Sequence, residues 1–143
     1  QILLRAPRAR VWRALTDAQE FGEWFQTVFT EPFRVGATLS GRVTSPGHEH
    51  VVMEITIEEM VPESRFSYRW LADAVEPGVD YSAEPTTLVT FTLQDAGGGT
   101  LLTIVESGFD GIPMARRAAA LRNNDHGWAV QMTAIEAYLR SKP

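Results

Sequence analysis

The sequence predicts an α+β fold in which one antiparallel sheet packs against a long C-terminal helix. Two short segments near the N-terminus carry apolar residues at helical spacing, and the chain from Met114 onward carries one apolar stripe with the same spacing. Between them, from Glu31 to about Ser107, short runs rich in Val, Thr, Ile and aromatic residues alternate with Gly, Pro, Asp and Ser, which is typical of strands and turns. Since 143 residues is a usual length for one domain, we expect residues 1–143 to form a single domain.

The N-terminal segment begins with a strand and continues into two short helices. The apolar run from Ile2 to Leu4 predicts the strand. Pro7 suits the first residue of a helix, which the apolar spacing extends to Thr16. Asp17 and Glu20 have the form of a capping box. In this motif the Asp17 side chain accepts a hydrogen bond from a backbone N–H of the next turn, and the Glu20 side chain reaches back to the backbone N–H of Asp17. A second short helix is therefore expected to begin there.

The middle of the chain predicts about six or seven strands in a meander, a usual size for one sheet. The expected strands include Phe33 to Val43 with a turn at Gly36, Val51 to Ile57, Phe66 to Trp70, Val89 to Leu93, and Leu102 to Ile104. Met60 breaks the alternation that Ile57 sets, so we expect a β-bulge at Glu58 and Glu59. The loop from Asp95 to Gly99 predicts a tight hairpin.

The C-terminal stripe predicts one long helix. Its apolar members are Met114, Ala118, Leu121, Trp128, Met132, Ile135 and Leu139. Poor helix formers from Asn123 to Gly127 interrupt the stripe, so a kink or a break there is an alternative. The acidic segment from Ala72 to Thr87 has no periodicity. We interpret it as a long surface loop, and a functional lid is the alternative.

Composition and charge exclude several classes of function. The net charge is −5, from 13 Lys and Arg residues against 18 Asp and Glu residues, so the chain lacks the basic footprint that nucleic acids and acidic membrane surfaces require. The absence of cysteine excludes disulfides, a thiolate nucleophile and Cys-ligated metal sites. No apolar run approaches the roughly 18 residues of a membrane span. We therefore expect a soluble, cytoplasmic protein with no nucleic-acid and no membrane partner.

The inward faces of the expected sheet and long helix are rich in large apolar side chains. Phe66, Tyr68 and Trp70 share one strand face, and Trp128 faces them from the helix. Such a row suits an apolar pocket, and it equally suits a filled core. Glu106 has the strand parity of inward residues, so it could bind a polar ligand group or act as a general base. An exposed strand end or a salt bridge is the alternative for Glu106.

Several short motifs, in their order and spacing, resemble a known superfamily. They are Pro7 with Val11 to Asp17, Trp24, Phe33 to Gly36, Pro62 to Trp70, Gly99 to Leu102, Ser107 to Phe109, and Gly127-Trp128 before Leu139. Together they resemble the START-like, birch-pollen-allergen-like (SRPBCC) superfamily and, within it, the activator of heat shock protein 90 ATPase homologue family. The chain departs from that pattern at Ala37, where a second glycine commonly stands, and at Glu106, where some relatives carry His.

The resemblance implies a helix-grip fold, in which a curved antiparallel sheet of six or seven strands wraps around the long helix. In many relatives, a cavity between the sheet and the helix holds a hydrophobic small molecule. We therefore expect a ligand pocket lined by Trp24, Met53, Ile55, Phe66, Tyr68, Trp70, Phe91, Ile104, Glu106, Trp128 and Met132. The leading hypothesis is a domain that binds a small hydrophobic or amphipathic molecule without a cofactor.

Two other functions are alternative hypotheses. An enzyme resembling the polyketide cyclases and aromatases of the same superfamily would use Glu106 or Tyr68 for proton transfer. A co-chaperone-like interaction protein would need an exposed patch for a large partner. The His-x-His pair His48 and His50, with His126, has the residue types of a metal site. His48 follows a turn, however, and His126 is expected on the surface of the long helix, so we interpret the histidines as solvent-exposed. We assign no catalytic and no metal-binding residue, and a homodimer stays open.

Overall fold

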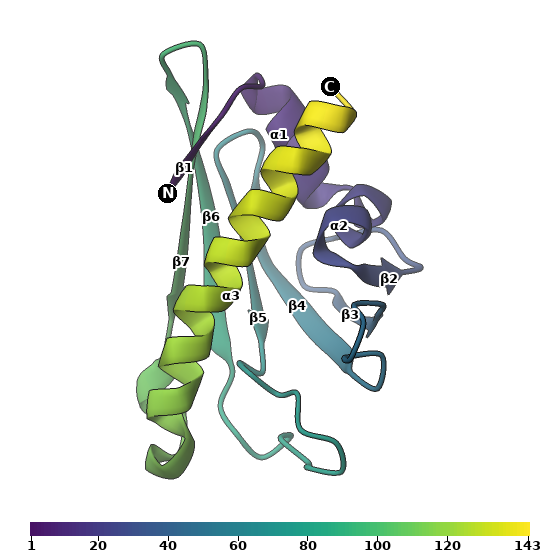
Figure 1. The fold of residues 1–143 in the computed structure, drawn as a ribbon, viewed down its shortest axis with the longest axis vertical. Helices are drawn as coiled ribbons and strands as arrows, with labels where there is room; N and C mark the ends of the chain where they lie inside the picture. Colours follow the sequence, from purple (N-terminus) through teal and green to yellow (C-terminus); the bar gives the residue numbers. More distant parts are fainter.

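One seven-stranded antiparallel sheet wraps around a 28-residue C-terminal helix in the computed structural model, which describes residues 1–143 (Figure 1). The elements in chain order are β1 (Ile2–Leu4), α1 (Arg8–Thr16), α2 (Ala18–Phe25), β2 (Thr27–Phe29), β3 (Thr38–Val43), β4 (Val52–Val61), β5 (Arg65–Trp70), β6 (Thr87–Ala96), β7 (Gly99–Ser107), the 3-10 helix η1 (Phe109–Gly111) and α3 (Met114–Ser141). None of the helices combines the length and the apolar character that a membrane crossing requires.

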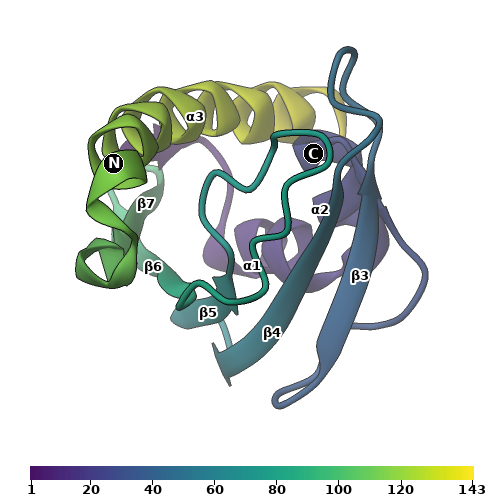
Figure 2. The same ribbon diagram turned by 90° about the horizontal axis from the view of Figure 1, so that it is seen from below.

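The curvature of the sheet creates the space that the helices fill. The strand order is β1-β7-β6-β5-β4-β3-β2, and every neighbouring pair is antiparallel. Strands β3 to β7 form a meander, and the short strands β1 and β2 lie at the two edges. Helix α3 runs across the concave side, with α1 and α2 beside its C-terminal half (Figures 1 and 2). This is the helix-grip α+β arrangement that the sequence predicts.

The two short helices form where the sequence places them, with differences at their caps. Pro7 is the N-cap of α1, with an extended backbone, instead of its first helical residue. The Asp17 carboxylate accepts from the Glu20 backbone N–H at 3.0 Å, as predicted. Glu20 does not complete the capping box, because its side chain turns toward α1 and α3. Gln26, in the left-handed region at φ 57°, ends α2 and starts the turn into β2, a three-residue strand too short to show periodicity.

Two turns and one bulge set the register of the sheet. Strand β3 begins at Thr38 and not at Phe33, because residues 34–37 form a turn with Gly36 at φ +85°. The predicted bulge is confirmed, since the register of β4 against β5 shifts between Ile57 and Glu59. The predicted hairpin is also confirmed, with Gly97 and Gly98 joining β6 to β7.

Helix α3 is continuous, so residues 123–127 neither end nor divide it. The predicted stripe is buried at Trp128, Ile135 and Leu139. It is wrong at Met114, Ala118 and Leu121, which are exposed. The first turns of α3 extend beyond the ends of the strands, so this part of the stripe has no sheet to pack against (Figure 1).

Aromatic rings fill the centre of the molecule between sheet and helices. Phe21, Phe66, Tyr68 and Phe91 are fully buried in one continuous apolar cluster. Phe66 stacks on Phe91 with ring centroids 5.8 Å apart, and the edge of Tyr68 packs against Phe66 at the same distance. Aromatic pairs at such distances add to the stabilisation from burial. This centre is close-packed, so any ligand space lies toward one end of the sheet.

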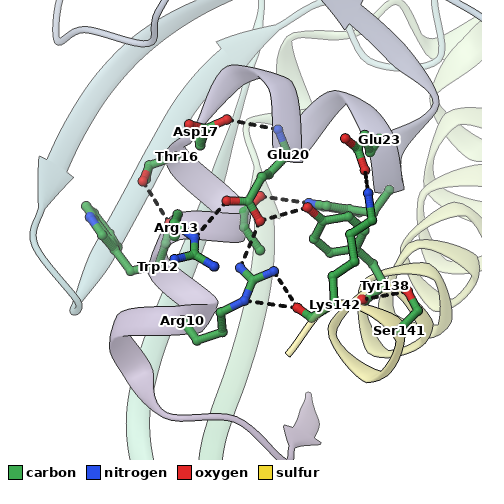
Figure 3. A network of polar contacts seen from close by, with 12 residues as sticks. Arg10, Trp12, Arg13, Thr16, Asp17, Glu20, Glu23, Tyr138, Ser141 and Lys142 are labelled. Carbon is green, nitrogen blue, oxygen red and sulfur yellow. Dashed lines mark hydrogen bonds and ion pairs between the residues drawn. The ribbon is translucent and has the colours of Figure 1, made fainter.

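A polar network ties the C-terminal end of α3 to the two short helices (Figure 3). Tyr138 Oη donates to Glu20 Oε1 at 2.7 Å, and Arg13 Nε donates to Glu20 Oε2 at 2.8 Å. Arg10 Nη1 lies 2.8 Å from Glu20 Oε1 as an ion pair, and Arg10 Nη2 donates to the Lys142 carbonyl at 2.7 Å. The network therefore joins α1, α2 and α3 through one carboxylate.

The network moves the pKa of both of its acids. Burial raises the pKa of Glu20, but the hydrogen bond from Tyr138 and the charges of Arg10 and Arg13 outweigh it and hold that pKa below its ordinary value of 4.5. Burial and the bond to Glu20 raise the pKa of Tyr138 to about 12. Tyr138 therefore stays a donor throughout the neutral range.

Glu20→Gln is expected to lower the free energy of unfolding by about 2–3 kcal/mol at pH 7, because bonds to a charged group are lost. The folded-state pKa of Glu20 is the lower one, so the unfolded chain takes up the proton first as pH falls. The wild-type advantage should be complete above pH 4.5 and decline below it. Urea titration at a series of pH values measures this.

The control is Glu136→Gln, which breaks the exposed pair of Glu136 with Arg140 on α3. Exposed helix pairs are worth less than about 0.5 kcal/mol, so this variant should be nearly neutral. An equal cost for the two variants, or a Glu20→Gln cost that does not shrink in acid, would contradict the role of Glu20.

Candidate functional site

A partly enclosed cavity of about 460 Å³ lies at the end of the sheet where the loop between β5 and β6 spans the gap between β4 and α3. Figure 2 looks into this end, with the loop in front. The wall comes from the first half of β4, the ends of β5 and β7, residues 71–75 and 82–86 of the loop, and the middle of α3. Half of its 24 lining residues are hydrophobic, so the cavity has a mixed surface. Its volume is within the usual range for small-molecule sites.

Three aromatic side chains form the inner wall of the cavity. Trp70 at the end of β5 stacks on Trp128 of α3, with ring centroids 5.8 Å apart. Phe25, the last residue of α2, packs against both rings at 6.0 and 6.1 Å. All three residues line the cavity. The wall therefore offers flat apolar surface to the body of a ligand.

A carboxylate lines the cavity beside this aromatic wall. Glu106 Oε2 accepts from the indole N–H of Trp70 at 2.9 Å and from the hydroxyl of Thr87 at 2.5 Å, and Oε1 accepts from the indole N–H of Trp128 at 2.9 Å. No Arg, Lys or His forms an ion pair with Glu106. An acceptor-only arrangement of this kind suits an ionised carboxylate. The three donors fix both tryptophans and leave the negative charge without a counter-ion.

The loop over the cavity is tied down on both sides. From α3, Arg116 binds both oxygens of Glu84 and the carbonyl of Ala72, and Asn123 donates to Asp73 at 3.0 Å. The bond to Glu84 is the largest cause that raises the pKa of Arg116. On the opposite side, His50 Nε2 lies 2.7 Å from the Val75 carbonyl. The segment interpreted as a surface loop is therefore one wall of the cavity.

The histidines do not converge. His48 and His126 are exposed at separate places, and His50 contacts the loop. No group of three His, Asp or Glu side chains is placed to hold a metal ion.

The structure divides the predicted pocket residues into two groups. Met53, Trp70, Glu106 and Trp128 line the cavity. The other seven do not line it: Trp24, Ile55, Phe66, Tyr68, Phe91, Ile104 and Met132. All of these except Met132 pack in or against the closed aromatic core, and Met132 is half-buried on α3. Trp24 Nε1, for example, donates to the Ala14 carbonyl at 2.8 Å.

Tyr68 is not placed to transfer a proton to a ligand. Its side chain is fully buried, and its hydroxyl has no hydrogen-bond partner. Burial, together with the negative charge of Glu106, raises the pKa of Tyr68 well above its ordinary value. The phenol therefore stays protonated inside the core.

The cavity also contains residues that the sequence did not single out as site residues. Phe25, Asn124 and Gly127 line it, with much of the loop. Asn124 and Gly127 did carry a signal, since both are poor helix formers inside a long helix. A residue kept in a helix against its propensity has a reason outside helix formation, and here both positions face the cavity.

Comparison with known proteins agrees with this fold. The chain matches structures of protein NE0264 from Nitrosomonas europaea (20% identity, 99% of this chain and 92% of that chain, TM-score 0.75) and of the Aha1 dimer from Colwellia psychrerythraea (15% identity, 94% and 89%, TM-score 0.67). It also matches DynU16, described as a putative protein in the dynemicin biosynthetic locus (24% identity, 97% of this chain, TM-score 0.73), but spans only 45% of that protein. These identities establish the shared fold alone.

The family assignment comes from the sequence. No curated protein matches the chain. The profile of the family described as activator of Hsp90 ATPase homolog 1-like protein matches residues 5–140. That match covers nearly the whole chain, and it agrees with the motifs from Pro7 to Leu139. The chain therefore belongs to the activator of Hsp90 ATPase homolog 1-like family.

Proposed function

We propose that this protein binds a small amphipathic molecule in the cavity between the β5–β6 loop, β4 and α3. The observation that carries the proposal is the partly enclosed space of about 460 Å³ with an aromatic inner wall and a loop of mixed polarity above it. A volume of this size corresponds to about fifteen water molecules, enough for a compact organic molecule. Release of that water from apolar surface provides the driving force for binding.

Binding is better supported than catalysis by the surroundings of the titratable groups. Glu106 already accepts three hydrogen bonds, which reduces its capacity as a general base. Tyr68, the other candidate for proton transfer, is fully buried in the core and does not line the cavity. The polyketide cyclase-like enzyme is the second candidate, and the structural neighbour DynU16 is described as a protein in the dynemicin biosynthetic locus. The enzyme hypothesis predicts a turnover that Glu106→Gln abolishes while binding survives.

The co-chaperone-like interaction and the homodimer stay predictions. The family description names an activator of the Hsp90 ATPase, and the Colwellia protein was solved as a dimer. Neither statement concerns the cavity, so the co-chaperone-like interaction and the homodimer are both independent of the binding proposal.

The test of binding is a titration with N-phenyl-1-naphthylamine, an uncharged aromatic probe whose fluorescence rises in apolar surroundings. We expect saturable binding of one probe per chain, with quenching of tryptophan emission because Trp70 and Trp128 line the cavity. Trp128→Phe should remove much of the quenching. The matched control is Trp12→Phe. Trp12 packs against the core and does not line the cavity, so its replacement should leave the quenching by the probe nearly unchanged. A linear, unsaturable signal would contradict the proposal.

A further inference from the structure

Two hydrogen-bond acceptors in the cavity wall, on Asn124 and Glu106, have free capacity. Asn124 Oδ1 is buried in the wall without a hydrogen-bond partner. Glu106 uses three of the roughly four lone-pair positions of a carboxylate, so one remains. Asn124 lies one helical turn before Trp128, whose indole binds Glu106, so the two acceptors belong to the same side of the cavity.

The charges around the cavity leave Glu106 without compensation. The ionisable residues in the wall are Glu54, Arg69, Asp73, Glu84 and Glu106. Arg69 Nε donates to Glu58 at 2.7 Å, and Asp73 and Glu84 are held by Arg116. The rim residue His50 binds a loop carbonyl. A ligand that brought a second negative charge into this space would be repelled, whereas a cation would meet an unpaired carboxylate.

The aromatic wall favours the same kind of ligand. Trp70 and Trp128 both line the cavity, and tryptophan faces attract cations more strongly than other aromatic faces do. An ammonium group has three donors and no acceptor, so it complements the free acceptor positions of Glu106 and Asn124. The carbon body of an amine can lie along the apolar residues Phe25 and Met53 in the same wall.

We propose that the cavity selects an organic amine in its protonated form, with the ammonium group at Glu106 and Asn124 and the apolar body against Trp70 and Trp128. This inference rests on the proposed binding function and names the ligand class. It excludes fatty acids and other carboxylates as the preferred ligands.

The test compares probes that share a body and differ only in the head group. Two series are used: 2-(2-naphthyl)ethylamine with the matching ethanol and 2-naphthylacetate, and octylamine with octanol and octanoate. Calorimetric titration at pH 7 should give each amine at least tenfold tighter binding than its alcohol, and each carboxylate the weakest binding. The preference of the amine over the alcohol should fall as salt is added.

Matched variants locate the preference at Glu106. In Glu106→Gln, the advantage of the amine over the alcohol should fall to within about twofold. Glu54→Gln removes the same charge from an exposed position in the wall, and should leave the preference intact. Since Glu106→Gln also alters three hydrogen bonds, Asn124→Asp provides an independent test. It adds a carboxylate where no bond is broken, and should tighten amine binding several-fold without tightening alcohol binding.

The outcomes separate the two proposals. If alcohols bind as tightly as amines, or if Glu54→Gln and Glu106→Gln reduce the preference equally, the amine assignment is wrong while the binding cavity stands. An amine affinity that Asn124→Asp leaves unchanged would also contradict the assignment. If no probe of either series binds the wild-type protein, both proposals fail.

Discussion

Trp128→Ala is expected to lower the free energy of unfolding by about 3 kcal/mol and to weaken probe binding at least tenfold. The side chain is 8% exposed, contacts Phe91, Trp70 and Phe25, and donates to Glu106. Truncation of a buried tryptophan costs about 3–5 kcal/mol, and the cavity beside Trp128 places the loss at the lower end. Guanidinium titration and N-phenyl-1-naphthylamine titration measure the two effects.

The control for this variant is Val130→Ala on the same helix. Val130 is 51% exposed and does not line the cavity, so both stability and affinity should stay close to the wild-type values. If Trp128→Ala keeps the wild-type affinity, the aromatic wall takes no part in binding.

Phe66→Ala is expected to lower the free energy of unfolding by about 3–5 kcal/mol and to leave the affinity of the folded protein for the probe unchanged. Phe66 is fully buried, stacks on Phe33 and Phe91, and does not line the cavity. The loss is that of a close-packed core position. Denaturant titration gives the stability, and binding is measured at low temperature where the folded state is most populated.

The contrast between Phe66 and Trp128 is the informative result. Phe66→Leu keeps more of the core and allows the binding measurement if the alanine variant is largely unfolded. Should either Phe66 variant abolish binding in the folded protein, the boundary drawn between core and cavity would be misplaced.

The fold follows largely from patterns that the sequence displays. Alternating apolar residues in β4 and β5 and the stripe through Trp128 and Ile135 each determine an element together with the face it buries. The errors are local. The strand expected from Phe33 to Val43 begins only at Thr38, after the predicted turn at Gly36. Met114 belongs to the predicted apolar stripe, yet it is exposed because the first turn of α3 lies beyond the end of the sheet.

The candidate site follows only in part, because strand parity says which side chains point inward and not what they meet there. Phe66 and Trp70 share one face of β5, yet Phe66 meets the packed core and Trp70 meets the cavity. The difference depends on the curvature of the sheet and on where α3 crosses it. The loop wall depends on contacts of Arg116 and His50 with residues far away in the sequence, which no local pattern encodes.

Gly127→Phe tests the central claim, that the cavity is the binding site, without removing any side chain. Gly127 is a helical residue in the cavity wall, and a Cβ there would meet no atom within 4 Å. Removing a glycine from a helix interior favours the helix by up to about 0.5 kcal/mol for phenylalanine, so the fold should be kept or slightly stabilised. Gly127→Ala favours the helix by about 1 kcal/mol and fills little of the cavity.

Calorimetric titration of N-phenyl-1-naphthylamine into wild type, Gly127→Ala and Gly127→Phe is the decisive measurement. The binding cavity predicts saturable binding of one probe per chain in the first two proteins and none in Gly127→Phe, with a thermal midpoint at or above the wild-type value. Wild-type affinity in a folded Gly127→Phe variant would contradict it, because the probe would then bind outside this cavity.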